Sequence, residues 1–542
     1  MSDYQVIVVG AGPTGLMLSN LLGRFGVRTL LVEKLPELID YPRAIGIDDE
    51  ALRSMQAIDL VEQVLAHTVP HHMVRAVNGQ GKVVAEMAPQ TDEFGWSRRN
   101  GFIQPLVDRE LLAGLKRYDC VDVRLNTEML DIAATDNDVT LTLRDLLSET
   151  DTAVTAAYVV GTEGGRSFTR EWIGGEFEGA TLKQCLVIDV ADDPIGSPNA
   201  IFGADTGRGW ATFGLPHGIR RWEFNLDESE TAEYAESDEF VHKMLADHVP
   251  DPARLNIVRR RVYTHNARVA TRWRKGRVLI AGDAAHIMPV NAGQGWNSCI
   301  RDAMNLGWKL TAVLSGLSSD ALLDTYQAER RDHVKGMVDL SVTMGKTFAG
   351  TGVAREAFRT AVGFVGDRVP AVKQYFSAMK FKPMPSYTRG AVVPTEVRQY
   401  KSIIPEHGAT RSAGKLFIQP RVSGPDGTVK LLDDVIGPRW AVIAWNNDPK
   451  RLLTAGHAAA LERIGAVLVT VVPEVQRGWA GAHASDGVLA IGDAAGRVKK
   501  WFDVRPYGVL FIRPDRVIAA ECLAMEADAT AEKLLAAISY QP

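Results

Sequence analysis

The stretch QVIVVGAGPTGLMLSNLLGRFGVRTLLVE, residues 5–33, decides the fold of the N-terminal part of the chain. Residues 5–9 are an apolar, largely β-branched run, which is typical of a strand buried on both faces. A glycine-rich turn follows at residues 10–15, and leucines then recur at helical spacing until Gly26. Residues 27–33 are a second apolar run that ends in an acid. The pattern predicts a strand, a helix and a second strand in one compact unit.

The glycine turn of this unit suits a nucleotide diphosphate. Its residues are Gly10, Gly12, Pro13, Thr14 and Gly15. Glycines at this GxGxxG spacing let a pyrophosphate approach the backbone, and the helix that follows presents its positive end to the phosphates. Glu33 is placed to accept hydrogen bonds from a ribose. A glycine turn without a ligand is the alternative, but the position between strand and helix favours a dinucleotide, which at this point is either NAD(P) or FAD.

A second unit of the same kind lies far along the chain, at GDAAHIMPVNAGQGWNS, residues 282–298. An apolar run precedes it and apolar residues at helical spacing follow it, with Asn297 or Ser298 as the predicted N-cap of the helix. Asp283, at the predicted end of a strand, is placed to accept hydrogen bonds from sugar-alcohol hydroxyls. Gly293 and Gly295 leave bare backbone against which a flat ring can lie, and the helix end favours negative charge on that ring.

Composition narrows the class of protein. A chain of 542 residues is expected to form two or three domains, and 46% hydrophobic with 23% charged residues is typical of a globular protein. The net charge of -5 argues against nucleic acid as a partner. No apolar stretch has the length of a membrane span, and the first residues do not have the pattern of a signal peptide, so we expect a cytoplasmic protein.

Metal binding and disulfide formation are not expected. The four cysteines are scattered and form no CxxC pair. His71, His72 and His286 lack the partners at ligand spacing that a metal site requires. The letters AIGDAAGR at residues 490–497 nearly repeat the second unit, but no GQGWN follows them, and we interpret the repeat as coincidence.

Three ordered motifs resemble those of the FAD-dependent aromatic hydroxylases, the single-component flavin monooxygenases. They are the glycine turn with Glu33, VVGTEGGRSFTR at residues 159–170, and RVLIAGDAAHIMPVNAGQGWNSCIRDAMNLGWKL at residues 277–310. The resemblance implies FAD as the bound dinucleotide. It also implies cofactor contacts from Arg43 in YPRAIGIDDEAL and from Gln104 in FIQPLVDREL, with Arg109 nearby.

The resemblance further implies a flavin-facing loop near the second unit. That loop comprises Pro289, Gly293, Gln294, Gly295, Trp296 and Asn297. One departure stands in the middle motif, where Glu163 occupies the place of the usual Asp and leaves the hydrogen bonding there open, as it is for Arg166.

The fold that the resemblance implies is α/β: a Rossmann-like FAD-binding domain interleaved with an antiparallel β-sheet substrate domain, followed by a thioredoxin-like C-terminal α/β domain. The expected boundaries are 1–175 and 265–345 for the FAD-binding domain, 176–264 for the substrate sheet with residues 70–100 as a contributor, 346–385 for a helical connector, and 386–542 for the C-terminal domain. Alternating residues at 210–215 and 222–225 favour antiparallel strands, and residues 507–520 favour a hairpin that turns at Pro514. A scaffold role or a contact in a homodimer is expected of the C-terminal domain.

The activity implied by the resemblance is hydroxylation of a small phenolic acid. NADH or NADPH acts as a transient reductant, O₂ is the second substrate, and a flavin C4a-hydroperoxide transfers the oxygen. The sequence identifies no general base. Two alternatives remain: a hydroxylase of another phenol or of a larger polyketide-like aromatic, and a flavin-fold protein that only binds.

Overall fold

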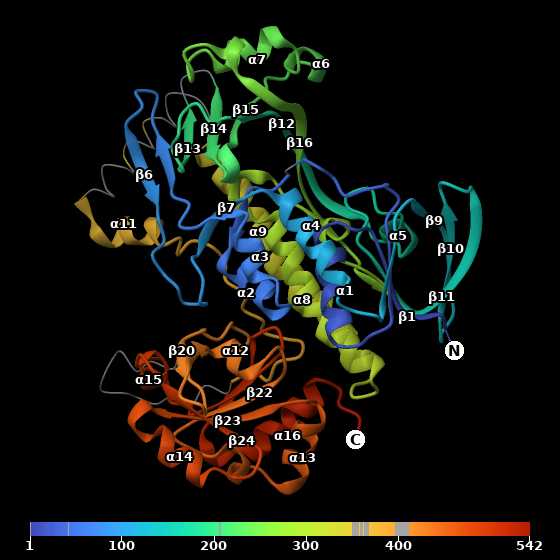
Figure 1. Cartoon of the computed structure of the whole chain (residues 1–542), viewed down its shortest axis with the longest axis vertical. Coiled ribbons are helices and arrows are strands. Elements are labelled where there is room, and N and C mark those ends of the chain that lie inside the picture. The colour runs from blue at the N-terminus through green and yellow to red at the C-terminus, as the bar shows by residue number, and fades with distance from the viewer. Residues whose placement is uncertain are drawn as a thin grey trace.

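A computed structural model of the chain describes residues 2–41, 43–204, 208–348, 368–395 and 411–542, together with residues 357 and 361. In this part of the chain there are three large sheets and one small one. The first two large sheets and the small sheet form the upper body in Figure 1, and the third large sheet forms the separate orange and red body below it. Of the expected helical connector, residues 346–385, the residues 349–356, 358–360 and 362–367 lie outside the described part of the chain.

The first sheet carries the glycine turn. Its strands lie in the order β17 (Arg274–Lys275), β18 (Val278–Ile280), β11 (Thr150–Gly161), β1 (Tyr4–Val9), β2 (Thr29–Val32) and β8 (Val121–Arg124), and β10 (Val139–Asp145) pairs with β11 and with β9 (Thr127–Ala134). Strands β18, β11, β1, β2 and β8 are parallel to their neighbours in this series. Because such strands are covered on both faces, they are continuous apolar runs, as seen at residues 5–9 and 278–280.

Helix α1 (Pro13–Arg24) joins β1 to β2 and packs against the long helix α8 (Gly295–Leu314), which crosses the centre of Figure 1. Apolar residues of both helices and of the first sheet form one core cluster. Gly26 has φ +71°, the left-handed conformation that ends a helix, so the predicted end of α1 is confirmed. Helices α2 (Asp49–Ala57), α3 (Val61–Leu65), α4 (Gln104–Leu115), α5 (Phe168–Trp172) and α9 (Asp324–Phe348) complete this body.

The second sheet is almost entirely antiparallel. Its strands lie in the order β19 (His286–Ile287), β16 (Asn256–Ala270), β12 (Phe177–Ala191), β15 (Arg220–Asn225), β14 (Gly209–Gly214), β13 (Ala200–Ala204), β5 (Val74–Val77) and β6 (Val83–Met87), and only β13 and β5 pair in parallel. The antiparallel pairing predicted from residues 210–225 is confirmed by β14 and β15. Helices α6 (Ala232–Ala235) and α7 (Asp238–Leu245) cover the far side of this sheet at the top of Figure 1.

A small sheet of β3 (Gly46–Asp48), β7 (Arg99–Phe102) and β4 (Thr68–Val69) lies in the upper body. After α9 the chain passes through α11 (Pro370–Ser377), which contacts β6, before it reaches the C-terminal body. The small sheet and this passage contribute side chains to the site described below.

The third sheet has the order β21 (Val429–Leu431), β20 (Arg421–Ser423), β24 (Val488–Asp493), β23 (Val467–Pro473), β22 (Ala441–Trp445), β25 (Val509–Ile512) and β26 (Ile518–Cys522). Its helices are α12 (Leu432–Ile436), α13 (Ala455–Arg463), α14 (Arg477–His483), α15 (Arg497–Asp503) and α16 (Ala527–Ala537). Strands β25 and β26 are antiparallel and enclose Pro514, which confirms the predicted hairpin.

One local prediction is wrong. Helix α8 begins at Gly295, and Gln294 occupies the N-cap position without a side-chain cap. Asn297 and Ser298 therefore lie inside the first turn of the helix. The side-chain amide of Asn297 makes hydrogen bonds to the neighbouring strand β3.

Candidate active site

A cavity of about 400 Å³ lies between the glycine turn, the start of α8 and the second sheet. The glycine turn and Glu33 line one end of it. Phe202, Phe213 and Glu223, from three neighbouring strands of the second sheet, line another part. One cavity thus joins the predicted nucleotide site to the predicted substrate domain.

The two glycine-rich units, far apart in sequence, are in direct contact. Gly282 has φ +63°, and a Cβ at this position would lie 2.0 Å from Oγ1 of Thr14. The backbone at the end of β18 therefore approaches α1 more closely than any residue with a side chain permits. The two units form a single wall of the cavity.

Most of the predicted cofactor residues line this cavity. They are Gly10, Gly12, Pro13, Thr14, Glu33, Arg43, Gln104, Asp283, Gly293, Gly295 and Trp296, joined by Pro289 and Gln294 of the flavin-facing loop. Gly15 and Asn297 are not among the lining residues. Gly15 instead packs under the turn, where a Cβ would lie 2.0 Å from the carbonyl oxygen of Gly10. Arg109 and Arg166 are exposed and lie outside the cavity.

The cavity has the bare backbone that a dinucleotide needs. A Cβ added at Gly12, Gly164 or Gly293 would meet no atom within 4 Å, although all three residues line the cavity. A side chain there would project into the space that a ligand would fill. The N-termini of α1 and α8 border the same space, and neither helix has an acidic residue in its first turn. Their positive ends favour an anionic ligand, so the residues present fit FAD.

Two acids stand at the ends of the strands that border the cavity. Glu33 follows β2, and its carboxylate accepts hydrogen bonds from the N–H groups of Ala11 at 2.8 Å and Leu35 at 3.0 Å. Asp283 follows β18, and its carboxylate accepts a weak hydrogen bond from the thiol of Cys299 at 3.6 Å. Burial, followed by the charge of Asp283, raises the pKa of that thiol. Both carboxylates retain lone pairs for ligand hydroxyls.

Asp108 is a buried acid of the cavity that sequence reasoning missed. Its carboxylate accepts hydrogen bonds from Nε2 of Gln104 at 3.0 Å and from Nε1 of Trp296 at 3.5 Å. Gln104 in turn accepts the N–H of Ala44 at 2.8 Å. Burial raises the pKa of Asp108 to about 7. Gln104 and Asp108 are four residues apart and share one face of helix α4, so their spacing was the signal in the sequence.

The second sheet was expected to form the substrate domain, but the individual residues that it contributes to the cavity were not predicted. The rings of Phe202 and Phe213 meet edge to face, with centroids 5.5 Å apart. Burial raises the pKa of Glu223 to about 7, against the opposing charge of Arg221. Arg99 of β7 completes this group. These four lining residues come from four strands, and their meeting depends on the pairing of those strands, which the sequence does not reveal.

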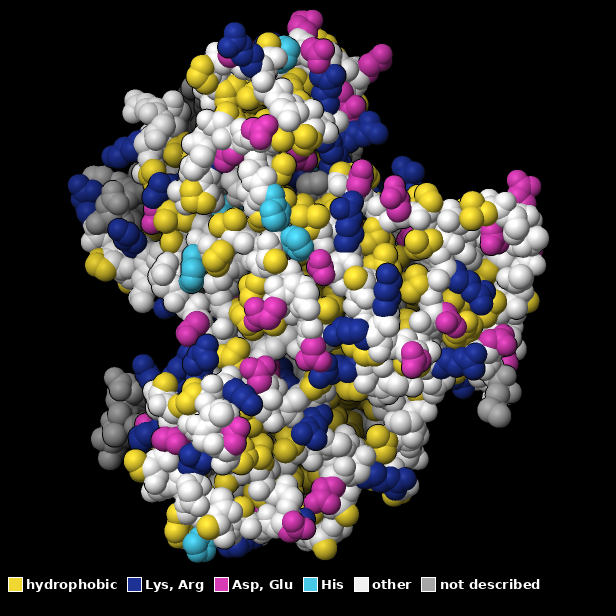
Figure 2. Space-filling view, viewed as in Figure 1, with side chains coloured by type: hydrophobic (Ala, Val, Ile, Leu, Met, Phe, Trp, Pro, Cys, Tyr) yellow, Lys and Arg dark blue, Asp and Glu magenta, His cyan; other side chains and the backbone are white. Residues whose placement is uncertain are grey.

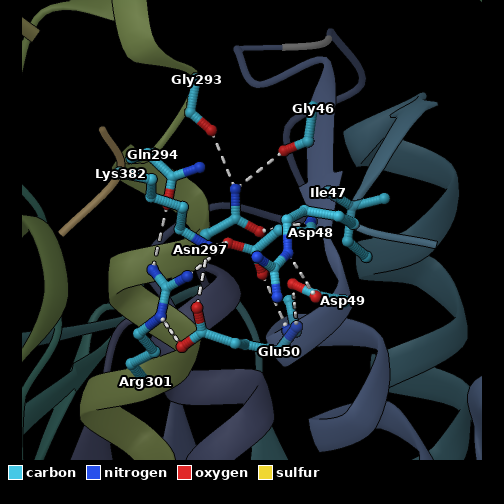
Figure 3. Close-up of polar contacts among 12 residues, drawn as sticks. Gly46, Ile47, Asp48, Asp49, Glu50, Gly293, Gln294, Asn297, Arg301 and Lys382 are labelled. Atoms are coloured by element: carbon cyan, nitrogen blue, oxygen red, sulfur yellow. Dashed lines mark hydrogen bonds and ion pairs between the residues drawn. The ribbon is translucent and has the colours of Figure 1, made fainter. Parts of the chain in front are cut away.

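A buried ionic cluster lies beside the predicted flavin-facing loop (Figure 3). Nη1 of Arg301 donates to Oε1 of Gln294 in that loop at 3.3 Å. Nε of Arg301 lies 2.8 Å from Glu50, and its Nη2 contacts Asp48. Nζ of Lys382, which arrives from the segment after α11, lies 2.8 Å from Asp48 and 2.8 Å from Glu50. Burial opposes ionisation of Glu50, but Arg301 and Lys382 outweigh it and hold its pKa well below the usual range. The cluster ties α8, α2 and the connecting segment together.

Asn297 completes this arrangement at the backbone level (Figure 3). Its Nδ2 donates to the carbonyl oxygens of Gly46 at 3.0 Å and Gly293 at 2.8 Å, and its Oδ1 accepts the N–H of Asp48 at 3.0 Å. The residue predicted to contact the cofactor therefore positions the loop that faces the cavity. Its side chain bridges β3 and the residue two positions before α8.

Glu163, which replaces the usual Asp of the middle motif, makes hydrogen bonds to other residues of the protein. Its carboxylate accepts hydrogen bonds from the backbone N–H of Thr169 at 3.0 Å and from the hydroxyl of Ser167 at 2.8 Å. These contacts tie the acid to the start of α5. Glu163 still lines the cavity.

In the described ranges, no group of three or more histidine, cysteine, aspartate or glutamate side chains has a geometry that holds a metal ion. His72 makes a hydrogen bond to the carbonyl oxygen of Gly214 at 3.0 Å, and His286 makes one to Asp302 at 2.6 Å.

Among the helices that the structure describes, none is long and apolar enough to cross a membrane. The repeated letters at residues 490–497 lie in the third sheet and α15, and they do not line the cavity.

Comparison with known proteins places the chain. The model of the family "FAD binding domain" matches residues 3–341, and the "HcaD C-terminal domain" matches residues 414–537. A 3-(3-hydroxy-phenyl)propionate/3-hydroxycinnamic acid hydroxylase of Mycobacterium sp. (strain JLS) is 48% identical over 527 residues, 97% of this chain and 90% of that one. The chain belongs to the FAD-dependent aromatic hydroxylases. It is an enzyme with FAD as its cofactor.

Further relatives agree with this family. A hydroxylase of the same description from Klebsiella pneumoniae is 45% identical over 535 residues, 98% of this chain and 94% of that one. Among solved structures, the flavin-dependent monooxygenase PieE has a TM-score of 0.82 at 20% identity and covers 99% of this chain and 100% of its own. Aklavinone-11 hydroxylase has a TM-score of 0.79 at 22% identity, with 99% of each chain covered. These two structures establish the fold shared by the family.

We expect Asp283→Ala to weaken FAD binding by about 10- to 100-fold, because a charged acceptor for a ligand hydroxyl contributes about 1.5–3 kcal/mol. The flavin content of the purified variant after gel filtration measures the effect. Asp493→Ala is the matched control, since Asp493 stands in the same letters, GDAA, but outside the cavity. Equal flavin content in both variants would contradict the role of Asp283.

Proposed function

We propose that this enzyme hydroxylates 3-(3-hydroxyphenyl)propionate at the position ortho to its hydroxyl group and yields 3-(2,3-dihydroxyphenyl)propionate. The phenol, O₂, NAD(P)H and a proton give the catechol, NAD(P)⁺ and water. The observation that carries the proposal is the single cavity that joins the predicted FAD site to an aromatic wall with an acid and a cation. The names of relatives at 45% and 48% identity support this substrate class.

When bound, FAD accepts electrons from NAD(P)H and supplies one oxygen atom of O₂ to the aromatic ring. The chain binds and positions the reactants. The glycine turn and Glu33 would hold the adenosine end, while Asp283 and the loop before α8 would hold the other end. Phe202 and Phe213 would pack against the phenol ring and exclude water from it.

We assign Glu223 as the group that accepts the proton of the phenolic hydroxyl. It lines the cavity beside the two phenylalanines, and its side chain is 11% exposed. Loss of the phenolic proton raises electron density at the ortho carbon, so a carboxylate at this place assists oxygen transfer. A group with a pKa of about 7 is suited to accept a proton at neutral pH.

Replacing Glu223 by Gln is expected to lower kcat/KM about 100-fold at pH 8, where the carboxylate of the wild-type enzyme is ionised. The wild-type rate should rise with pH through about 7, and the variant should lack this rise. Steady-state kinetics between pH 6 and pH 9 measure the loss of kcat/KM and the dependence of the rate on pH. A variant with the wild-type rate and profile would exclude Glu223 as the proton acceptor.

Glu223→Gln should lower activity, but it should raise the stability of the folded protein at high pH. The pKa of Glu223 is raised from 4.5 to about 7, so the folded state keeps a proton that the unfolded state loses above 4.5. The wild-type protein therefore loses up to about 3 kcal/mol of stability between these two values, and Glu223→Gln does not. The variant should be the more stable protein at high pH.

Product identification tests the proposed reaction. The holoenzyme is incubated with NADH or NADPH, O₂ and either 3-(3-hydroxyphenyl)propionate or 3-hydroxycinnamate, and products are identified by mass spectrometry and NMR. We expect one added oxygen, ortho to the original hydroxyl group. NAD(P)H oxidation that yields only peroxide with these phenols, or equal turnover of large polycyclic phenols, would contradict the substrate.

For residues 411–542 we propose a thioredoxin-like domain with a structural role. The support is the order β23, β22, β25, β26, with β22 and β23 parallel and the last two strands antiparallel. The segment carries one cysteine, Cys522, so a dithiol role is not proposed. A contact between two copies of the chain through this domain is part of the same proposal.

A further inference from the structure

Arg99 is a cation of the cavity without a counter-ion among the residues that the structure describes. It lies at the start of β7, and its guanidinium lines the main cavity. Within the described ranges, no carboxylate lies within 4.0 Å of it, and its buried Nε has no hydrogen-bond partner. Arg99 as a whole is half-buried, but its Nε is fully buried. A buried polar atom of a cation without a partner is costly, and a ligand that supplies an acceptor removes that cost.

One carboxylate on the neighbouring strand is already bound to other cations. Asp48 of β3 is the cross-strand partner of Arg99. Its carboxylate is held by Arg301 and by Nζ of Lys382 at 2.8 Å, in the cluster of Figure 3. Asp48 therefore leaves the charge of Arg99 unpaired. Burial alone lowers the pKa of Arg99 to about 10, which is still far above neutral pH, so the group remains a cation.

Arg99 also has apolar residues beside it, in a small extension of the main cavity. A small side cavity of about 20 Å³ shares Arg99, Phe202, Asn291 and Gln294 with the main cavity. Apolar residues form much of the rest of its wall, namely Val74, Met87, Leu340, Met344, Met379 and Phe381. Apolar walls suit methylene groups, and the guanidinium suits an anion at their end.

The other cations that line the main cavity in the described chain are placed differently. Lys34 follows Glu33 at the end where the adenosine would lie. Arg43 is exposed, with its guanidinium within 3.5 Å of the hydroxyl of Tyr41. Lys382 lines the side cavity together with Phe202, but its Nζ is held by Asp48 and Glu50 at 2.8 Å each. Among the described residues, Arg99 is therefore the cation beside Phe202 that no carboxylate holds.

We propose that Arg99 binds the carboxylate of the substrate and selects phenols that carry a short carboxylic acid chain. This assignment rests on the proposed function, and it names the residue that gives the enzyme its preference for phenols with a carboxylate over neutral phenols. Arg99 acts in binding, and the chemistry at the ring remains with FAD and Glu223. A planar guanidinium binds a carboxylate through two parallel hydrogen bonds.

The test compares an acid with its neutral analogue in the holoenzyme. We measure kcat, KM and, by calorimetry, the Kd for 3-(3-hydroxyphenyl)propionate and for 3-(3-hydroxyphenyl)propanamide with the wild-type enzyme and Arg99→Met. For the acid, the variant should show KM and Kd raised about 10- to 100-fold, because a hydrogen bond to a charged group contributes about 1.5–3 kcal/mol. For the amide the values should stay within about threefold. Arg99→Lys should recover part of the preference for the acid.

Two controls separate this role from a structural one. Arg421→Met removes an exposed arginine of β20 outside the cavity and should change the kinetics of neither substrate. The flavin content and the unfolding midpoint of Arg99→Met should equal those of the wild type. A variant that loses FAD, or that loses the acid and the amide equally, would overturn the assignment.

The outcome also separates this assignment from the function on which it rests. A wild-type enzyme that hydroxylates the acid, beside an Arg99→Met enzyme with an unchanged preference for it, overturns the role of Arg99 alone. A wild-type enzyme that neither binds nor hydroxylates the acid overturns the proposed function and the role of Arg99 together.

Discussion

Gly15→Ala should yield a protein that lacks FAD and unfolds at a lower denaturant concentration than the wild type. A Cβ at this position would lie 2.0 Å from the carbonyl oxygen of Gly10 and 2.8 Å from Oγ1 of Thr162. The first of these is a backbone atom, which cannot rotate away. The start of α1 must therefore move from the turn, at a cost of about 1–3 kcal/mol or more. Flavin absorbance and urea unfolding of the purified variant measure the two effects.

Gly12→Ala is the matched control for Gly15→Ala. A Cβ at Gly12 meets no atom within 4 Å and would enter the cavity. This variant should keep the unfolding midpoint of the apoprotein but bind FAD more weakly, because the methyl group fills ligand space. If Gly15→Ala and Gly12→Ala behave alike in both measurements, the distinction between a packing glycine and a ligand-facing glycine is incorrect.

Arg301→Met should lower the free energy of unfolding by about 3–5 kcal/mol, because the removal of one partner leaves buried carboxylates without sufficient counter-charge. Asp48 and Glu50 would retain only Lys382, and all four side chains are at most 7% exposed. Flavin content should fall as well, since the cluster ties the start of α8 to β3. Urea unfolding and flavin absorbance are again the measurements.

The control for this substitution is Arg109→Met, which removes an exposed arginine from α4. It should change the free energy of unfolding by less than about 0.5 kcal/mol. An equally small change in Arg301→Met would show that the cluster does not hold the loop. The surface in Figure 2 carries acidic and basic side chains interspersed, and charges of that exposed kind are not expected to behave like the buried cluster.

The local sequence pattern was sufficient to predict the structure of the first glycine-rich unit. The run at residues 5–9, the glycine turn and Gly26 each specify their own conformation through sterics and burial, so β1, α1 and their junction were predictable. The same pattern predicted strand, turn and helix around Asp283. The hypothesis of one shared ligand predicted that the two units lie together, and both line the same cavity. The direct contact between Thr14 and Gly282 was not predicted.

The failures have a common physical cause in partners that come from distant strands. Asn297 has the side chain of an N-cap, yet its amide bonds Gly46 and Asp48 of β3, a strand nearly two hundred and fifty residues away. Arg99, Phe202 and Glu223 meet because the small sheet and the second sheet lie beside the same cavity. No local propensity specifies such a meeting, since it depends on register and on the packing of whole sheets.

The most direct test of the central claim is a crystal structure of the protein with FAD and 3-(3-hydroxyphenyl)propionate. We predict that FAD spans the cavity from the glycine turn and Glu33 to the loop that precedes α8, with the phenol against Phe202 and Phe213. FAD that contacts only one of the two glycine-rich units, or a phenol bound away from the second sheet, would contradict it.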